Sequence, residues 1–130
     1  MSRPRRVVRV VVPRPDRVRS LGRATGFGWL DARLVRGGWL AVMSPEELAV
    51  YAFLCLVADH QGVSWYRRDR IREVLCLDER AVWHALDRLE QLGLVAYQPF
   101  HRNASEGFRQ VLDLPASGPA ARLSWTAGER

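Results

Sequence analysis

Only three residues separate two stretches of helical periodicity, and this short junction constrains the fold more than any other feature of the sequence. Apolar residues recur at helical spacing over 67–75 and again over 79–92, with Cys76-Leu77-Asp78 between them. Asp78 is a favourable N-cap residue, and Gly93 stands where a C′ glycine ends a helix. The spacing therefore predicts a helix-turn-helix, with the second helix over 79–92.

The apolar pattern of these two helices also predicts which face of each is buried. In the first, Ile71, Val74 and Leu75 follow the i, i+3, i+4 pattern of a buried face. In the second, one side of the helical wheel is apolar: Val82, Ala85, Leu86 and Leu89. Its opposite side is polar and predicted to face solvent: Arg80, His84, Asp87 and Gln91.

A third helix is predicted upstream, over 45–60. Ser44 and Glu47 have the spacing of a capping box, with Pro45 at the first helical position. The following residues leave almost no polar face, which predicts a central core helix or a contribution to an oligomer interface. Cys55 and Cys76 lie in apolar helical contexts, so we expect buried thiols in a reducing cytoplasm.

Strand-like segments flank the helices. Residues 94–98 and 108–114 predict two strands of a hairpin whose polar tip is 99–107, and residues 63–66 predict a short strand. Residues 26–40 combine several large apolar side chains with a Gly37-Gly38 pair. We expect that segment to form a strand or short helix packed on the body, followed by a turn.

The order helix, short strand, helix, turn, helix, hairpin resembles the winged-helix DNA-binding fold over residues 44–114. The stretch LCLDERAVWHALDRLEQLGLV, residues 75–95, looks like the end of the second helix, the turn, the recognition helix and the exit into the wing. It is similar to bacterial MarR-like regulators and to winged helices of plasmid and phage replication initiators. The resemblance implies a single, mainly α domain with a small β-hairpin wing.

The resemblance also implies which residues meet DNA, because a helix fits the major groove while its partner helix and the wing contact the backbone. The matching positions are Arg80, Trp83, His84 and Arg88 on the third helix, Arg67 and Arg68 at the start of the second, and Arg102 and Asn103, next to His101, at the wing tip. Each has an alternative. Arg80 could be a solvated or ion-paired arginine, His84 and the Arg67–Arg72 run simply exposed, and Trp83 packed on the N-terminal segment or a dimer partner.

The charge of +6 is unevenly distributed. Residues 1–38 hold ten Arg against two Asp, whereas residues 39–115 hold eight Arg against eleven carboxylates. Within 1–23, prolines oppose regular helix, so we expect a flexible basic arm that neutralises phosphates or enters the minor groove. The arm residues assigned to DNA are Arg3, Arg5, Arg6, Arg9 and Arg14. The alternatives are a tail of merely biased composition and a native start further downstream.

No catalytic constellation, metal-ligand spacing, cofactor motif, signal peptide or long apolar run occurs in the sequence. We therefore expect a cytoplasmic, non-enzymatic protein with no metal, cofactor or membrane partner. Its expected organisation is an arm over 1–23, a winged-helix domain over 24–115 and a flexible tail over 116–130. We expect double-stranded DNA binding, in transcription regulation or as an accessory of replication or a mobile element. The alternative is a protein-interaction adaptor, and a homodimer would use the first helix or residues 26–40.

Overall fold

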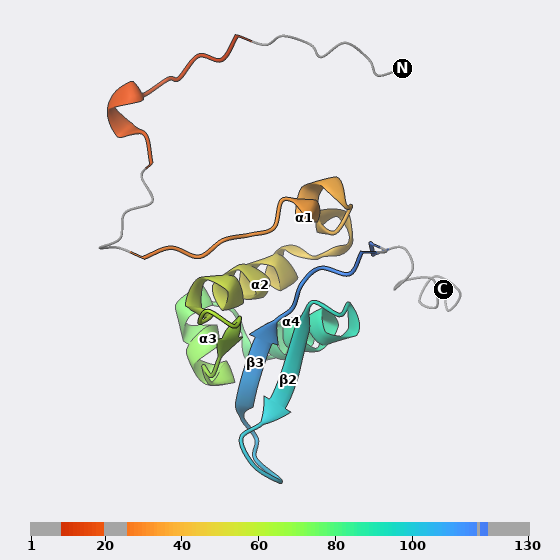
Figure 1. Ribbon diagram of the computed structural model, residues 1–130. Coiled ribbons are helices and arrows are strands. Elements are labelled where there is room, and N and C mark those ends of the chain that lie inside the picture. Colours follow the sequence, from red (N-terminus) through yellow and green to blue (C-terminus); the bar gives the residue numbers. More distant parts are fainter. Residues whose placement is uncertain (1–8, 20–25, 117, 120–130) are drawn as a thin grey trace.

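A computed structural model describes residues 9–19, 26–116 and 118–119 of the chain (Figure 1). Helices lie on one side of a three-stranded antiparallel sheet, in the strand order β1-β3-β2. In chain order the elements are α1 (Arg33–Arg36), α2 (Pro45–Val57), β1 (Val63–Ser64), α3 (Arg68–Leu75), α4 (Glu79–Gln91), β2 (Val95–Pro99) and β3 (Gly107–Val111). Short 3-10 turns occupy Pro15–Arg17 and Leu40–Val42. This arrangement is a winged helix-turn-helix, as predicted.

The turn between α3 and α4 forms as its residue types require. Cys76 takes a left-handed conformation at the end of α3, with φ of 55°. The Asp78 side chain then accepts the Ala81 backbone N–H at 2.7 Å and starts α4. The prediction of a buried Cys76 thiol was wrong: the residue is exposed, because it serves the turn and not the apolar face of α3. Val74 is also exposed, so Ile71 alone is fully buried on that helix.

Helix α2 begins at the predicted capping box and ends earlier than predicted. Ser44 Oγ accepts the Glu47 N–H and Glu47 accepts the Ser44 N–H, both at 3.1 Å. The helix stops at Val57 because the Asp59 carboxylate accepts the backbone N–H groups of Gln61 and Val63 and closes a turn there. Helix α2 packs on α4, α3 and β3, which confirms its central place in the core.

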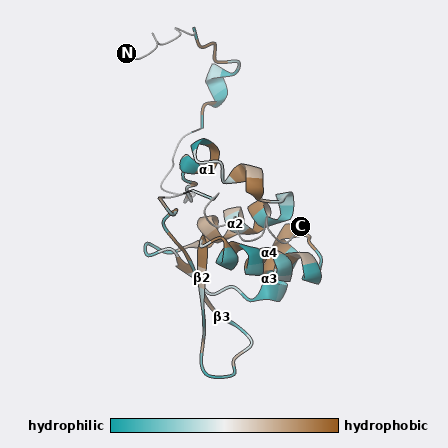
Figure 2. Cartoon of the chain, turned by 90° about the vertical axis from the view of Figure 1, so that its right-hand side faces the viewer, coloured by the Kyte–Doolittle hydropathy of each residue, from teal (hydrophilic) through white to brown (hydrophobic). Residues whose placement is uncertain are grey.

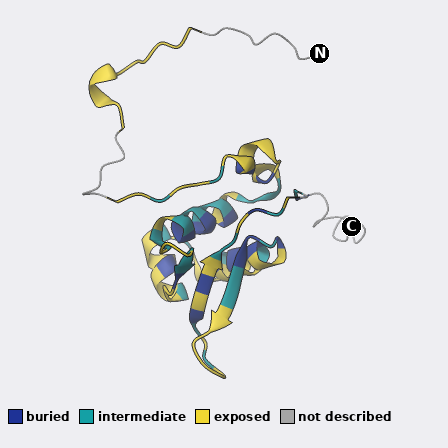
Figure 3. Cartoon of the chain, in the orientation of Figure 1, coloured by how far each residue is buried: buried dark blue, intermediate teal, exposed yellow. Residues whose placement is uncertain are grey.

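The core lies where α2, α4 and the inner face of the sheet meet (Figure 3). All four residues predicted to face inward from α4 are buried: Val82, Ala85, Leu86 and Leu89. Gly93 follows with φ of 78°, as a C′ glycine requires. The fully buried side chains include Trp39 from the N-terminal extension, which ties that extension to the domain.

The wing is the hairpin of β2 and β3, in which Tyr97 pairs with Arg109 and Gln98 with Phe108. It extends beyond the helices, and its tip is mostly hydrophilic (Figures 1 and 2). At the tip Asn103 has a φ of 68°. The short first strand is confirmed but covers only Val63–Ser64.

Residues 26–40 pack only in part. Leu34 and Trp39 are buried, whereas Phe27, Trp29 and Leu30 are exposed. The chain passes so close to α2 that a Cβ on Gly28 would lie 2.7 Å from the Leu56 Cα. Residues 33–36 form the short helix α1, and a turn follows at Gly37 and Gly38. That part of the prediction is confirmed.

The two ends of the chain are described only in part. Residues 9–19 are exposed throughout. Arg3, Arg5 and Arg6 of the predicted arm and most of the predicted tail lie outside the described residues. No helix within the described ranges has both the length and the apolar character needed to cross a bilayer.

Candidate nucleic-acid interface

The outward face of α4 is open to solvent. Arg80 is exposed, and the His84 side chain is 70% exposed. Asp87 lies on the same face and is also exposed. No described residue of the N-terminal segment covers this face, so it remains accessible to a large ligand. Arg80 forms no ion pair within the described part of the chain.

Arg88 lies at the edge of this face that borders α2 and is largely withdrawn from it. Its side chain is only 20% exposed, and its Nε lies 3.6 Å from a carboxylate oxygen of Glu47. Glu47 is 95% buried at the side chain, and its charge faces both Arg88 and, at 4.0 Å, the imidazole of His84. A buried carboxylate needs such partners, so Arg88 holds α2 against α4.

The opposite edge of α4 meets the start of α3 and the wing through Arg68. Its guanidinium lies 4.6 Å from the centroid of the Trp83 ring, a cation–π contact. It also donates to the Ser105 carbonyl at 3.0 Å and lies 3.4 Å from the Glu106 carboxylate. Among the described residues Trp83 contacts Arg68, and its packing on the N-terminal segment or on a dimer partner stays a prediction. Arg68 therefore joins α3, α4 and the wing.

Arg67 stands next to Arg68 but remains accessible. Its side chain is 70% exposed and pairs loosely, at 3.5 Å, with Asp69. It borders a hollow of about 240 Å³ between α3, α4 and the wing. Three arginines and three carboxylates line the hollow: Arg67, Arg68, Arg72, Asp69, Glu79 and Glu106. With its charges balanced, the hollow offers no net attraction for an anion.

The remaining predicted contacts are scattered. Arg102 and Asn103 are exposed at the wing tip, where the Arg102 carbonyl lies 2.9 Å from Nδ1 of His101. In the arm, Arg9 is exposed, whereas Arg14 pairs with Asp16 at 2.8 Å. The structure thus does not gather the predicted set into one patch. It presents Arg80 and His84 on α4, Arg67 beside the hollow, and Arg102 at the wing tip.

Sequence reasoning missed two buried charged residues that shape this interface. Arg109 on β3 is 93% buried, its guanidinium lies 4.8 Å from the Tyr97 ring, and its Nη1 has no hydrogen-bond partner among the described residues. Burial lowers the pKa of Arg109. Strand alternation puts Arg109 on the face opposite Phe108, and the apolar Phe108 would have been placed inward, so no signal in the sequence pointed to a buried Arg109. Glu47 was identified as a cap, but its pairing with Arg88 depends on tertiary packing.

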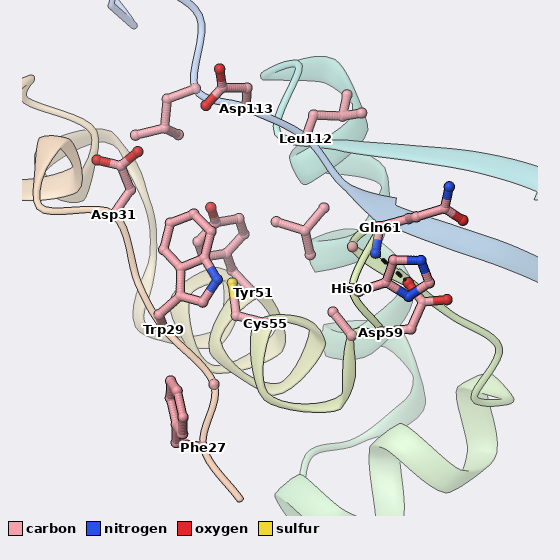
Figure 4. Close-up of a pocket in the computed structure, with 15 residues that line it drawn as sticks. Phe27, Trp29, Asp31, Tyr51, Cys55, Asp59, His60, Gln61, Leu112 and Asp113 are labelled. Atoms are coloured by element: carbon pink, nitrogen blue, oxygen red, sulfur yellow. Dashed lines mark hydrogen bonds between the residues drawn. The ribbon is translucent and has the colours of Figure 1, made fainter. Parts of the chain in front are cut away.

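A separate cavity of about 520 Å³ lies between residues 27–31, α2 and the chain that follows β3 (Figure 4). Trp29 and Tyr51 line it, and burial raises the pKa of Tyr51. Asp31 and Asp113 line one side, and both pair with Arg33. None of its described lining residues is an arginine, and three are aspartates, so this lining does not favour a phosphate.

Comparison with known proteins adds one distant likeness. No family model matches the chain, and no curated protein matches it. Among solved structures, a MarR family regulator from Neisseria meningitidis aligns with a TM-score of 0.43 and 20% identity. The alignment covers 73% of this chain and 63% of that regulator, which is less than two thirds of its length. The winged-helix assignment above rests on the arrangement of the elements themselves.

Proposed function

We propose that this chain is a non-enzymatic protein that binds double-stranded DNA and regulates transcription. The observation that carries the proposal is the uncovered outer face of α4, held between a helix and a wing. An α-helix with its side chains is about 10–12 Å across and fits a major groove about 12 Å wide. Arg80 and His84 are exposed on that face and can donate hydrogen bonds to base edges or phosphates.

The N-terminal arm is proposed to supply most of the binding energy that does not depend on sequence. Residues 1–23 carry eight Arg and one Asp. Each phosphate that an arginine neutralises releases counterion, so affinity should fall steeply with added salt. Residues 9–19 are exposed throughout, so no packing of these residues against the body needs to break before they contact DNA.

The proposal is tested by replacing Arg80 with alanine and measuring fluorescence anisotropy of a labelled duplex selected from a random library. Loss of a base contact should weaken binding to the selected duplex about tenfold and binding to unrelated duplexes far less. Arg36→Ala is the matched control, because Arg36 is an exposed arginine on α1. Equal effects of the two substitutions, or selection of no preferred duplex, would overturn specific reading by α4.

A protein-interaction adaptor is the second candidate, and the carboxylates of α4 favour it. Glu79, Asp87 and Glu90 are exposed on this helix and would repel phosphates. Deleting residues 1–23 separates the two functions. A truncated body that still prefers its selected duplex supports DNA reading. A body that loses all DNA binding supports the adaptor.

The proposal also covers where the protein acts, what it binds and whether it forms a dimer. We assign the protein to the cytoplasm, with DNA as its partner and a homodimer formed through α2 or residues 26–40. The exposed apolar side chains of Phe27, Trp29 and Leu56 support that dimer surface. Participation in replication or in a mobile element stays a prediction, and nothing in the site favours it over regulation.

A further inference from the structure

The outer face of the wing sheet carries a continuous strip of aromatic rings that DNA reading by α4 does not use. We name Trp65, Phe108 and Phe100 the aromatic strip; they are 59%, 41% and 44% exposed. The Trp65 and Phe108 ring centroids lie 6.4 Å apart, and those of Phe108 and Phe100 lie 4.9 Å apart. Both contacts are edge-to-face. Exposed aromatic clusters of this kind mark binding surfaces.

The strip faces outward because of strand register. Ser64 pairs with Arg109 and Arg109 with Tyr97, and both Ser64 and Arg109 are buried on the inner side. Phe108 is the neighbour of Arg109 along β3, so it must point to the opposite face. Its side chain is therefore held on a rigid strand, and Trp65 and Phe100 lean against it from the neighbouring chain segments.

The chemistry of this face suits an unpaired base better than a duplex. In B-DNA the bases are stacked inside the helix, so their flat surfaces are inaccessible to a protein ring. A separated strand exposes them, and aromatic side chains on a sheet then stack with them. Gln98 and Gln110 lie exposed on the same outer face and offer amides to base edges.

The charge around the strip favours an anionic partner over a cationic one. None of the outward residues of the described strands is a carboxylate: Val63, Ala96, Gln98, Phe108 and Gln110. Arg67 follows Trp65 by two residues and Arg102 follows Phe100 by two, and both are exposed. These two arginines lie close to the strip in sequence, and Arg67 also borders the hollow between α3, α4 and the wing.

We propose that the aromatic strip binds an unpaired DNA strand, such as one that is displaced or melted beside the duplex held by α4. This rests on the proposed function for bringing the protein to DNA, but the two surfaces are separate. Stacking on the strip is insensitive to base sequence, since every base has a flat face. The strip would therefore add affinity for open or gapped DNA without changing which duplex is read.

The test uses the full chain and labelled 12-nucleotide oligo-dT, with the selected duplex measured alongside. Trp65→Ala and Phe108→Ala should each weaken oligo-dT binding about tenfold and leave duplex binding within about twofold. Val74→Ala is the control, because Val74 is an apolar side chain on α3 that is 48% exposed and belongs to neither the strip nor the proposed dimer surface. An oligo-U arm separates DNA from RNA, and oligo-U binding tenfold tighter than oligo-dT would overturn the assignment to DNA.

Ultraviolet cross-linking of oligo-dT to the unmutated protein provides a readout that does not depend on variants folding. Cross-links should map by mass spectrometry to the tryptic peptides 89–102 and 103–109, which hold Phe100 and Phe108. Cross-links confined to the arm, or equal effects of Trp65→Ala and Val74→Ala, would overturn the strip. If the unmutated protein binds oligo-dT but no selected duplex, that result would contradict the proposed function and leave the aromatic strip intact.

Discussion

The arginines of the folded body and those of the N-terminal arm have the same chemistry and different roles. The body, residues 39–115, contains eight arginines. Five of them contact other groups of the body: Arg67, Arg68, Arg70, Arg88 and Arg109. In residues 9–19 only Arg14 has a partner among the described residues, and that partner is its neighbour Asp16.

This difference shows that the number of arginines is a poor measure of a DNA-binding surface. In the body, carboxylates outnumber arginines, and the less exposed guanidiniums join helices and wing. Arg88 holds α2 to α4, and Arg68 holds α3 to the wing. In residues 9–19, Arg9, Arg17 and Arg19 are exposed and have no ion pair among the described residues. We infer that the body supplies shape and the arm supplies electrostatic affinity.

Deleting residues 1–23 should produce the largest effect on binding. Affinity for any duplex at low salt should fall about 100-fold or more, and the slope of log affinity against log salt should become shallower by several units. Thermal unfolding of the body should not change, because residues 9–19 are exposed. Anisotropy titrations at several salt concentrations measure this effect. A slope equal to that of the full chain would assign the phosphate contacts to the body.

Glu47→Ala should cause the largest loss of stability, about 2 kcal/mol, because it removes one side of the capping box and leaves Arg88 without its partner. Chemical denaturation measures the loss. Glu47→Gln separates the two causes, since glutamine can keep the cap while losing the charge. Glu46→Ala, at the exposed neighbouring position, is the control and should change stability little. Equal losses for Glu46 and Glu47 would contradict a structural Glu47–Arg88 pair.

Arg68→Ala should cost about 1–2 kcal/mol of stability through its ion pair, its hydrogen bond and its contact with Trp83. Arg67→Ala should cost less than about 0.5 kcal/mol, because its pairing with Asp69 is fully solvated. The adjacent positions thus test the division between structural and accessible arginines. We expect Arg67→Ala to weaken DNA binding while leaving the free energy of unfolding nearly unchanged. A larger loss of unfolding free energy for Arg67→Ala than for Arg68→Ala, measured by denaturation, would reject the division.

The smallest effect concerns acid stability. Hydrogen bonds from the Val63 and Gln61 N–H groups lower the pKa of Asp59. The stability that this carboxylate contributes is complete above its unfolded pKa of about 3.9 and is lost as pH falls through the lowered folded value. Asp59→Asn should therefore reduce the loss of stability between neutral pH and about pH 3.

Asp16→Asn is the matched control for acid stability. A side-chain hydrogen bond from Arg14 lowers the pKa of Asp16 as well. Because the described arm packs against nothing, that change should leave global unfolding of the body unaltered at every pH. Urea titrations at neutral and acid pH make the comparison. An acid-sensitive effect of Asp16→Asn on the body would show that the arm docks on it.

Several elements could be predicted because their causes are local. The capping box at Ser44, the Asp78 cap and the glycine at position 93 act within one turn of chain. The inward face of α4 follows from helical periodicity alone. Candidate site residues were predicted less well. Their accessibility depends on partners distant in sequence, such as Glu106 for Arg68, 38 residues away.

The sequence by itself determined where α2 and α4 begin, the three-residue turn, the winged topology and the concentration of positive charge at the N-terminus. Backbone preferences, apolar periodicity and residue counts depend on neighbours along the chain. Only the tertiary structure decided which arginines are structural, that Cys76 is exposed, that Trp83 lies against Arg68, and that three separate aromatic residues meet on the wing. Those outcomes depend on which surfaces come together, because burial and pairing of a charge are set by distance in space.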